Sequence, residues 1–164
     1  MKKLFIIRHA KSSWAISGQS DFTRALNERG EIDAPKMAKR LIAKEPVIDL
    51  FLSSPAIRAH KTCEHFYQAF KHNQPLNTYD ERLYHASQEI FYQVISELSD
   101  SINSVAVFSH NPGITDFVNS LDTGVRLDNM PTCAIYAISS DITHWRDFQD
   151  STKQFLFFDF PKNK

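Results

Sequence analysis

The chain has 164 residues, of which 42% are hydrophobic, which is enough for one domain around a hydrophobic core. Its 19 basic and 19 acidic residues cancel, so the overall charge favours neither nucleic acid nor an acidic membrane as a partner. Four apolar residues separate Lys3 from Arg8, too few for a signal peptide, and no apolar run approaches the ~18 residues of a membrane span. We therefore expect one cytoplasmic domain over residues 1–164 with no nucleic-acid or membrane partner.

The first predicted element is a short apolar run, Leu4 to Ile7, that is typical of a buried strand and ends at Arg8 and His9. In open α/β sheets, ligands bind beyond the carboxyl ends of the strands. A guanidinium presents a planar fork of donors that fits phosphate, and a neutral imidazole can attack phosphorus. This strand end therefore predicts a phosphoryl site.

A polar stretch from Lys11 to about Asp21 follows and is long enough to wrap over that site. Ser12 and Ser13 are candidates to line the pocket, and Asp21 can pair with Arg24 to hold the loop. A helix is predicted from about residue 27 to residue 44.

Within that helix, Pro35 is expected to cause a kink or to delay the start. The apolar run of residues 47–52 predicts a second buried strand. After it, Ser54 can cap a helix that has Pro55 at its first position, which places Arg58 in the first helical turn. This helix is expected to run to about residue 71.

The remaining elements continue the alternation of strands and helices. We expect strands at residues 76–79, 105–108, 134–139 and 155–160, helices at 88–98 and 114–121, and a short edge piece at 145–148. His110 follows the strand at 105–108 and marks a third strand end. The alternation predicts an α/β fold in three layers, α/β/α, with a mostly parallel central sheet. Cys63 and Cys133 lack metal-ligand or redox spacing and are expected to be reduced thiols.

These residues together carry a family resemblance that covers nearly all of the chain. The chain resembles the histidine phosphatase superfamily, with its phosphoglycerate-mutase-like fold, and is most similar to the small SixA-type phosphohistidine phosphatases. Three positions depart from the family pattern: Ala10 replaces a glycine, Lys61 a glutamine, and Ala15 a pocket asparagine of the mutases. The matching segments are Arg8-His9, Ser54-Pro55 with Arg58-Ala59 and Thr62, Asp80 to Tyr84, and Ser109-His110.

The resemblance implies a phosphatase that uses neither a metal nor another cofactor. His9 is the expected nucleophile, which forms a phosphohistidine that water then hydrolyses. Arg8, Arg58 and His110 are expected to bind the phosphoryl oxygens. Glu81 is the expected general acid and base, which requires a raised pKa.

The substrate follows from a steric argument, because few residues are available for a lid. An open pocket admits a phosphorylated side chain, so phosphohistidine in a protein is the leading substrate and a small phosphomonoester, such as a sugar phosphate, is the alternative. A module that binds phosphorylated ligands without turnover is the alternative from another class. Arg8 and Arg58 as surface cations, His9 as a core histidine and Glu81 as half of a solvated charge pair are the structural alternatives.

Overall fold

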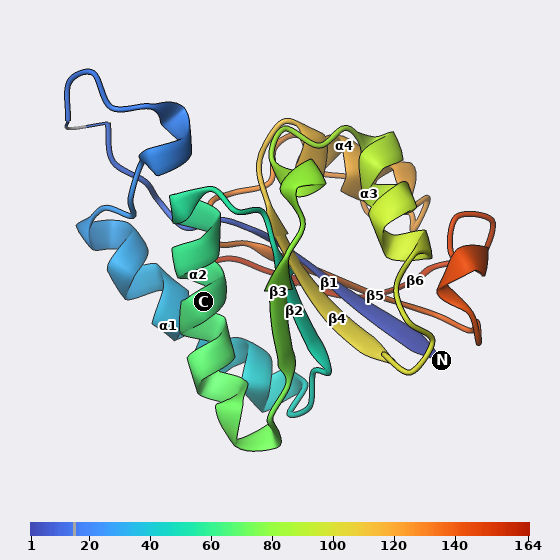
Figure 1. The fold of residues 1–164 in the computed structure, drawn as a ribbon. Helices are drawn as coiled ribbons and strands as arrows, with labels where there is room; N and C mark the ends of the chain where they lie inside the picture. Colours follow the sequence, from blue (N-terminus) through green and yellow to red (C-terminus); the bar gives the residue numbers. More distant parts are fainter. Residues whose placement is uncertain (15) are drawn as a thin grey trace.

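The computed structural model describes residues 1–14 and 16–164, so the prediction for Ala15 lies outside the described residues. The described residues form a six-stranded sheet in the order β3-β2-β4-β1-β5-β6 (Figure 1). Strands β1 to β4 are parallel, β5 is antiparallel to β1, and β6 is antiparallel to β5. The predicted mostly parallel sheet is therefore confirmed. The strands are β1 (Lys2–Arg8), β2 (Leu50–Ser53), β3 (Leu76–Tyr79), β4 (Ser104–Ser109), β5 (Ile135–Ser140) and β6 (Gln154–Asp159).

Helices cover both faces of the sheet, as the three-layer prediction requires. One face carries α1 (Glu28–Lys44) and α2 (Ile57–Phe70), and the other carries α3 (Gln88–Ser96) and α4 (Gly113–Ser120) (Figure 1). Successive side chains of a strand point to opposite faces, so the apolar centre of β1, residues 4–7, supplies both layers. Phe5 and Ile7 join the core beneath α1 and α2, whereas Leu4 and Ile6 join the core beneath α3 and α4.

The start of α1 agrees with the sequence prediction, whereas the start of α2 differs from it. Helix α1 begins at Glu28, where Asn27 accepts a hydrogen bond of 2.9 Å from the Gly30 N–H, so Pro35 lies inside the helix and does not delay it. Helix α2 begins at Ile57 rather than at Pro55. Ser54 is not its N-cap, because the strand end turns the Ser54 hydroxyl toward His110.

The prediction of a short edge strand at residues 145–148 is wrong. The chain forms a 3-10 helix there, η4 (Trp145–Asp147), because Trp145 is completely buried. Its indole N–H donates a hydrogen bond of 2.8 Å to the carbonyl of Ile102, which fixes the segment against the core. The indole therefore anchors this turn in the interior.

Both cysteines are unpaired and buried, and burial raises the pKa of the Cys63 and Cys133 thiols. They are thus core side chains in reduced form.

Among the described residues, no helix combines the length and apolar character needed to cross a membrane.

Candidate active site

The parallel strands β1, β2 and β4 end at the same edge of the sheet, where they surround a cavity of about 360 Å³. Arg8 is paired with Ser109 in the β1–β4 register, and Ser53 with Phe108 in the β2–β4 register. The residues that follow these strands therefore come together at this cavity. It is lined by Arg8, His9, Lys11, Ser12, Trp14, Asp21, Arg24, Arg58, His85, His110, Asn111 and Thr132.

His9 is buried and held in one tautomer. Its Nδ1 lies 2.7 Å from the carbonyl oxygen of Ala10, and because a carbonyl can only accept, Nδ1 carries the proton. The Ala10 N–H in turn donates to the Thr62 hydroxyl at 2.9 Å, which donates to the Arg58 carbonyl. The Nε2 lone pair is therefore left available for attack.

The surroundings keep His9 neutral. Burial lowers its pKa to about 3, and the nearby positive charges of Arg58 and Arg8 act in the same direction. The hydrogen bond to Ala10 opposes the shift without reversing it. An unprotonated imidazole is the form that a nucleophile requires.

His110 lies beside His9, with their ring centres 5.2 Å apart. The Nε2 atom of His110 is 2.8 Å from the Ser54 hydroxyl, which also accepts a hydrogen bond from the Ala56 N–H. When the Ser54 hydroxyl donates its proton to His110 Nε2, Nδ1 is the protonated nitrogen and can donate a hydrogen bond. Burial lowers the pKa of His110 to about 2, and the proximity of His9 and Arg58 adds to the effect.

The two predicted arginines are fixed by contacts that leave part of each guanidinium unused. Arg8 donates from Nη1 to the Met130 carbonyl at 2.8 Å. Arg58 donates from Nη1 to the Asp21 carbonyl at 2.7 Å and from Nη2 to the Asp21 carboxylate at 3.0 Å. In both residues Nε is buried, and neither Nε has a hydrogen-bond partner within the described chain.

Arg24 is the functional candidate that sequence reasoning underestimated. It was expected only to pair with Asp21, yet its guanidinium is buried and lines the cavity. It stacks on Trp14, with its central carbon 3.5 Å from the ring centre. Its Nε lies 3.3 Å from the Asp21 carboxylate in a geometry that forms no hydrogen bond, and Nε and Nη1 both remain without hydrogen-bond partners among the described residues.

Asp21 ties this segment to the rest of the site. The Tyr84 hydroxyl donates a hydrogen bond of 2.7 Å to the carboxylate that also accepts from Arg58. Partial burial alone would raise the pKa of Asp21, but the Tyr84 hydrogen bond and the Arg58 charge lower it. The carboxylate is therefore charged, and it orients Arg58.

The remaining predicted residues divide into two groups. Ser12 lines the cavity, whereas Ser13 is not among its lining residues and donates its backbone N–H to the Ala25 carbonyl. Glu81 is exposed and also lies outside the cavity lining. It sits in the 3-10 helix η3 (Glu81–Leu83), where the buried Leu83 directs the turn inward.

The segment after η3 reaches the cavity through His85 instead of Glu81. His85 adopts a left-handed backbone conformation, with φ of 59°, which is uncommon for a residue other than glycine. Its ring packs on Tyr84 with centres 4.0 Å apart. The sequence does not single out His85 as a site residue, because no pattern reveals a turn of this kind.

Five buried nitrogens without hydrogen-bond partners belong to four residues of this one cavity. A tetrahedral oxyanion in this cavity would accept hydrogen bonds from the guanidinium groups that line it. Within residues 1–14 and 16–164, no group of three or more His, Cys, Asp or Glu side chains is arranged to hold a metal ion.

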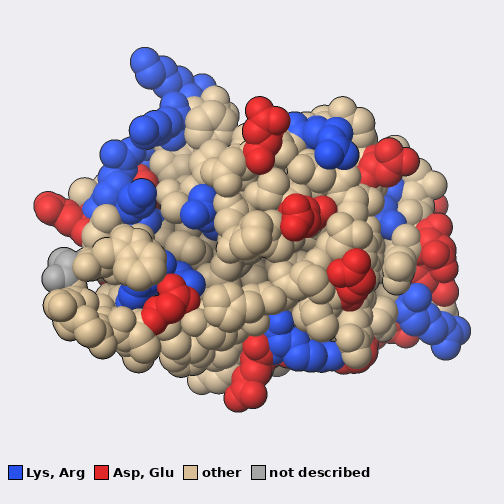
Figure 2. All heavy atoms as spheres, turned by 90° about the horizontal axis from the view of Figure 1, so that it is seen from above, with Lys and Arg blue, Asp and Glu red and all other residues tan. Residues whose placement is uncertain are grey.

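Seen from above, Lys and Arg side chains gather at the upper left of the molecule, so the neutral chain has a locally basic patch on this face (Figure 2).

Comparison with known proteins decides the family. The sequence model of the histidine phosphatase superfamily (branch 1) matches residues 4–101. The chain belongs to this superfamily. A histidine phosphatase is an enzyme that removes phosphoryl groups, so the predicted family and enzyme class are confirmed.

Solved structures of SixA proteins share the fold of this histidine phosphatase along almost its whole length. A SixA protein of Agrobacterium tumefaciens is 25% identical, covers 98% of each chain and superposes with a TM-score of 0.82. The protein histidine phosphatase SixA complexed with tungstate is 24% identical, covers 97% of each chain and has a TM-score of 0.80. An uncharacterized protein of Mycobacterium tuberculosis is 28% identical over 165 residues, which is 95% of this chain and all of the relative.

Proposed function

We propose that this histidine phosphatase cleaves phosphoryl groups through a covalent intermediate on His9, and that its substrate is phosphohistidine in a protein. The observation that carries the proposal is the meeting of three guanidinium groups and a second histidine with one buried, neutral histidine at a single cavity. In phosphoryl transfer, negative charge spreads over three equatorial oxygens, and preorganised donors stabilise it. Arg8, Arg24, Arg58 and His110 supply such donors.

The first step is in-line attack of His9 Nε2 on phosphorus. A bond forms between Nε2 and phosphorus while the bond from phosphorus to the leaving group breaks. In the second step, water attacks the phosphohistidine, inorganic phosphate leaves, and His9 is regenerated. The fixed proton on Nδ1 keeps the imidazole in the same tautomer throughout.

The leaving group needs a proton, and His85 is the residue we assign to supply it. Asp21 is held ionised by Tyr84 and Arg58, and the low pKa of His110 keeps that ring from acting as an acid near neutrality. His85 is exposed and lines the same cavity. It donates its proton to the leaving atom and then accepts one from the attacking water, so the proton count balances over the cycle.

A protein substrate is supported by the shape of the cavity mouth and by the relatives. Lys11, Trp14 and His85 are exposed residues of the lining, so the cavity opens to solvent between them. A phosphorylated side chain can enter such an opening while still attached to its protein. The likeness to SixA proteins over nearly the whole chain points in the same direction. A small phosphomonoester is the alternative substrate.

The test is turnover of three substrates by the purified protein in EDTA: a phosphohistidine protein, an alkyl phosphate and an aryl phosphate. We expect activity to survive EDTA and to be lost in His9→Asn, with phosphohistidine giving the highest kcat/KM. Hydrolysis of aryl phosphate without any action on phosphohistidine proteins would contradict the substrate. Activity that disappears with EDTA and returns with a divalent ion would contradict the mechanism.

A further inference from the structure

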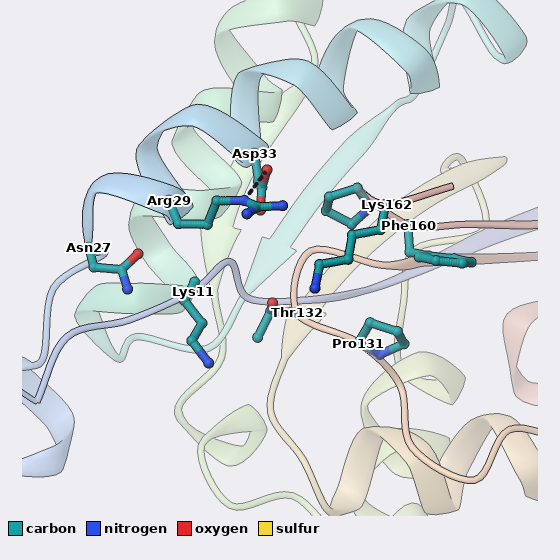
Figure 3. Close-up of a pocket in the computed structure, with 9 residues that line it drawn as sticks. Lys11, Asn27, Arg29, Asp33, Pro131, Thr132, Phe160 and Lys162 are labelled. Carbon is teal, nitrogen blue, oxygen red and sulfur yellow. Dashed lines mark hydrogen bonds and ion pairs between the residues drawn. The ribbon is translucent and has the colours of Figure 1, made fainter. Parts of the chain in front are cut away.

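A second cavity, of about 390 Å³, lies next to the phosphoryl site. It is formed by the start of α1, the segment after β1, the loop before β5 and the segment after β6 (Figure 3). Lys11 and Thr132 line both cavities, so these two residues form the wall between them. The two cavities are therefore neighbours, separated by the thickness of these two residues.

The shared wall is fixed to the strand end that holds the nucleophile. The N–H of Cys133, next to Thr132, points at the carbonyls of Arg8 and His9, at 3.1 Å from each. On the other side, the Lys11 carbonyl accepts a hydrogen bond of 3.0 Å from the Asn27 N–H. A side chain at Gly30 would collide with that same carbonyl, so the glycine permits this close approach of α1.

Arg29 is the fixed cation of this second cavity. Its Nε donates to both carboxylate oxygens of Asp33, at 3.1 and 3.0 Å, and Asp33 is 4% exposed. The two Nη groups have no partner within the described part of the chain. The buried carboxylate thus holds the guanidinium in place without occupying its outer edge.

The other walls combine positive charge with apolar surface. Figure 3 shows the Arg29 guanidinium and the Lys162 ammonium pointing into the space between α1 and the C-terminal segment. Pro131 and Phe160 provide apolar surface beside them. Lys11, Arg29 and Lys162 carry three positive charges, whereas Asp33 is the single carboxylate and is already engaged by Arg29.

We propose that this cavity binds a second anionic group of the substrate, a carboxylate or phosphate carried on an apolar stem on the leaving-group side. The inference rests on the proposed function, because it places the reacting phosphoryl group beside His9. It deepens that function by naming a substrate class: molecules with two anionic groups, one at each cavity. The second group belongs either to a small phosphorylated metabolite or to an acidic side chain next to the phosphorylated residue of a protein.

Binding of non-hydrolysable phosphonates tests the proposal independently of turnover. The first arm compares an aryl phosphonate that carries a carboxylate on a short alkyl stem with its methyl ester, by calorimetry. The second arm compares two phosphonate-containing peptides, one with a glutamate beside the phosphonate and one with a glutamine. We expect the anionic member of at least one pair to bind about tenfold more tightly, as for one charge-assisted hydrogen bond.

Variants locate the effect. Lys162→Met should lower the ratio of affinities within a pair. Arg29→Lys keeps a cation beside Asp33 but removes the two Nη groups that have no partner among the described residues, so it should lower the ratio as well. Lys71→Met, which removes an exposed lysine from the 3-10 helix η2 (Lys71–Asn73), should leave the ratio unchanged. The arm that shows the preference identifies the source of the second anion.

Equal affinities within both pairs would overturn the proposal, as would a preference that survives both variants of the cavity. The two proposals fail separately. If the protein binds the phosphonate with the additional carboxylate more tightly but hydrolyses no phosphate, only the proposed function is contradicted. If the protein hydrolyses phosphate through His9 but shows no such preference, only the proposal that the second cavity binds an anionic group is contradicted.

Discussion

The Nδ1 atom of His9 lies 2.7 Å from the carbonyl oxygen of Ala10, the next residue along the chain. A histidine thus takes its tautomer from its own neighbour, and the Thr62 hydroxyl fixes that neighbour by accepting from the Ala10 N–H. This local arrangement leaves Nε2 as the nucleophilic nitrogen without help from a carboxylate.

The first prediction concerns the charge of that ring. Because burial and the adjacent guanidinium groups lower the pKa of His9 to about 3, its ring should stay neutral, with the proton on Nδ1, from pH 8 down to about pH 5. Long-range nitrogen–proton NMR of the phosphate-free protein measures this directly. A His9 pKa above the ordinary value of ~6.5 would contradict the arrangement.

The second prediction concerns stability against pH. The folded pKa of His9 lies below its unfolded value of ~6.5, so between these values the unfolded state binds the extra proton. Stability is therefore complete above pH ~6.5 and falls as the pH falls toward 3, with a loss of about 2 kcal/mol for one such histidine between pH 7 and pH 5.

Denaturant unfolding of the wild type and His9→Gln in phosphate-free buffer measures this loss. The variant should show a weaker pH dependence by about 2 kcal/mol over the same interval. Parallel curves for the two proteins would show that His9 titrates equally in both states. His110 should behave in the same way, because its pKa is lowered to about 2.

The third prediction concerns Arg24. Removing its buried guanidinium in Arg24→Ala should lower kcat/KM for an aryl phosphate by roughly 10²-fold and weaken inhibition by inorganic phosphate, since it removes donors from the oxyanion site. Arg146→Ala, which removes an exposed guanidinium from η4, is the control. If both variants keep wild-type kinetics, Arg24 only packs on Trp14.

The fourth prediction separates His85 from Glu81. His85→Gln should slow an alkyl phosphate by about 10²-fold, and an aryl phosphate much less, because only the alkoxide needs a proton donor. Glu81→Gln, a change of similar size in the same loop, should slow both substrates equally or not at all. Selective loss in Glu81→Gln alone would restore the acid role to Glu81.

Sequence reasoning could predict the parts of the site that follow directly from a strand. Arg8, His9 and His110 lie within two residues of the end of an apolar run, and parallel strands bring their carboxyl ends to one edge of a sheet. Arg58 follows the same logic, because it lies in the first turn of α2, just after β2. These positions depend on the hydrophobic pattern of the strands and on their parallel arrangement, both of which can be predicted from a single sequence.

The rest of the site depends on turns whose direction the sequence does not encode. Arg24 is 16 residues further along the sequence than Arg8, and no periodic pattern predicts that its side chain is buried. Glu81 and His85 belong to one short loop, and the 3-10 turn η3 determines which of them reaches the cavity. Ser54 looked like a helix cap because serine is common there, but His110 engages its hydroxyl. The single-domain organisation stays a prediction.

The most direct test of the central claim is rapid quench of the protein with a ³²P-labelled substrate, followed by mapping of the label. We expect a burst of protein-bound label on His9 that survives alkali, is lost in acid, and is absent from His9→Asn. Turnover at the full rate with no label on His9, or with the label on another residue, would contradict it.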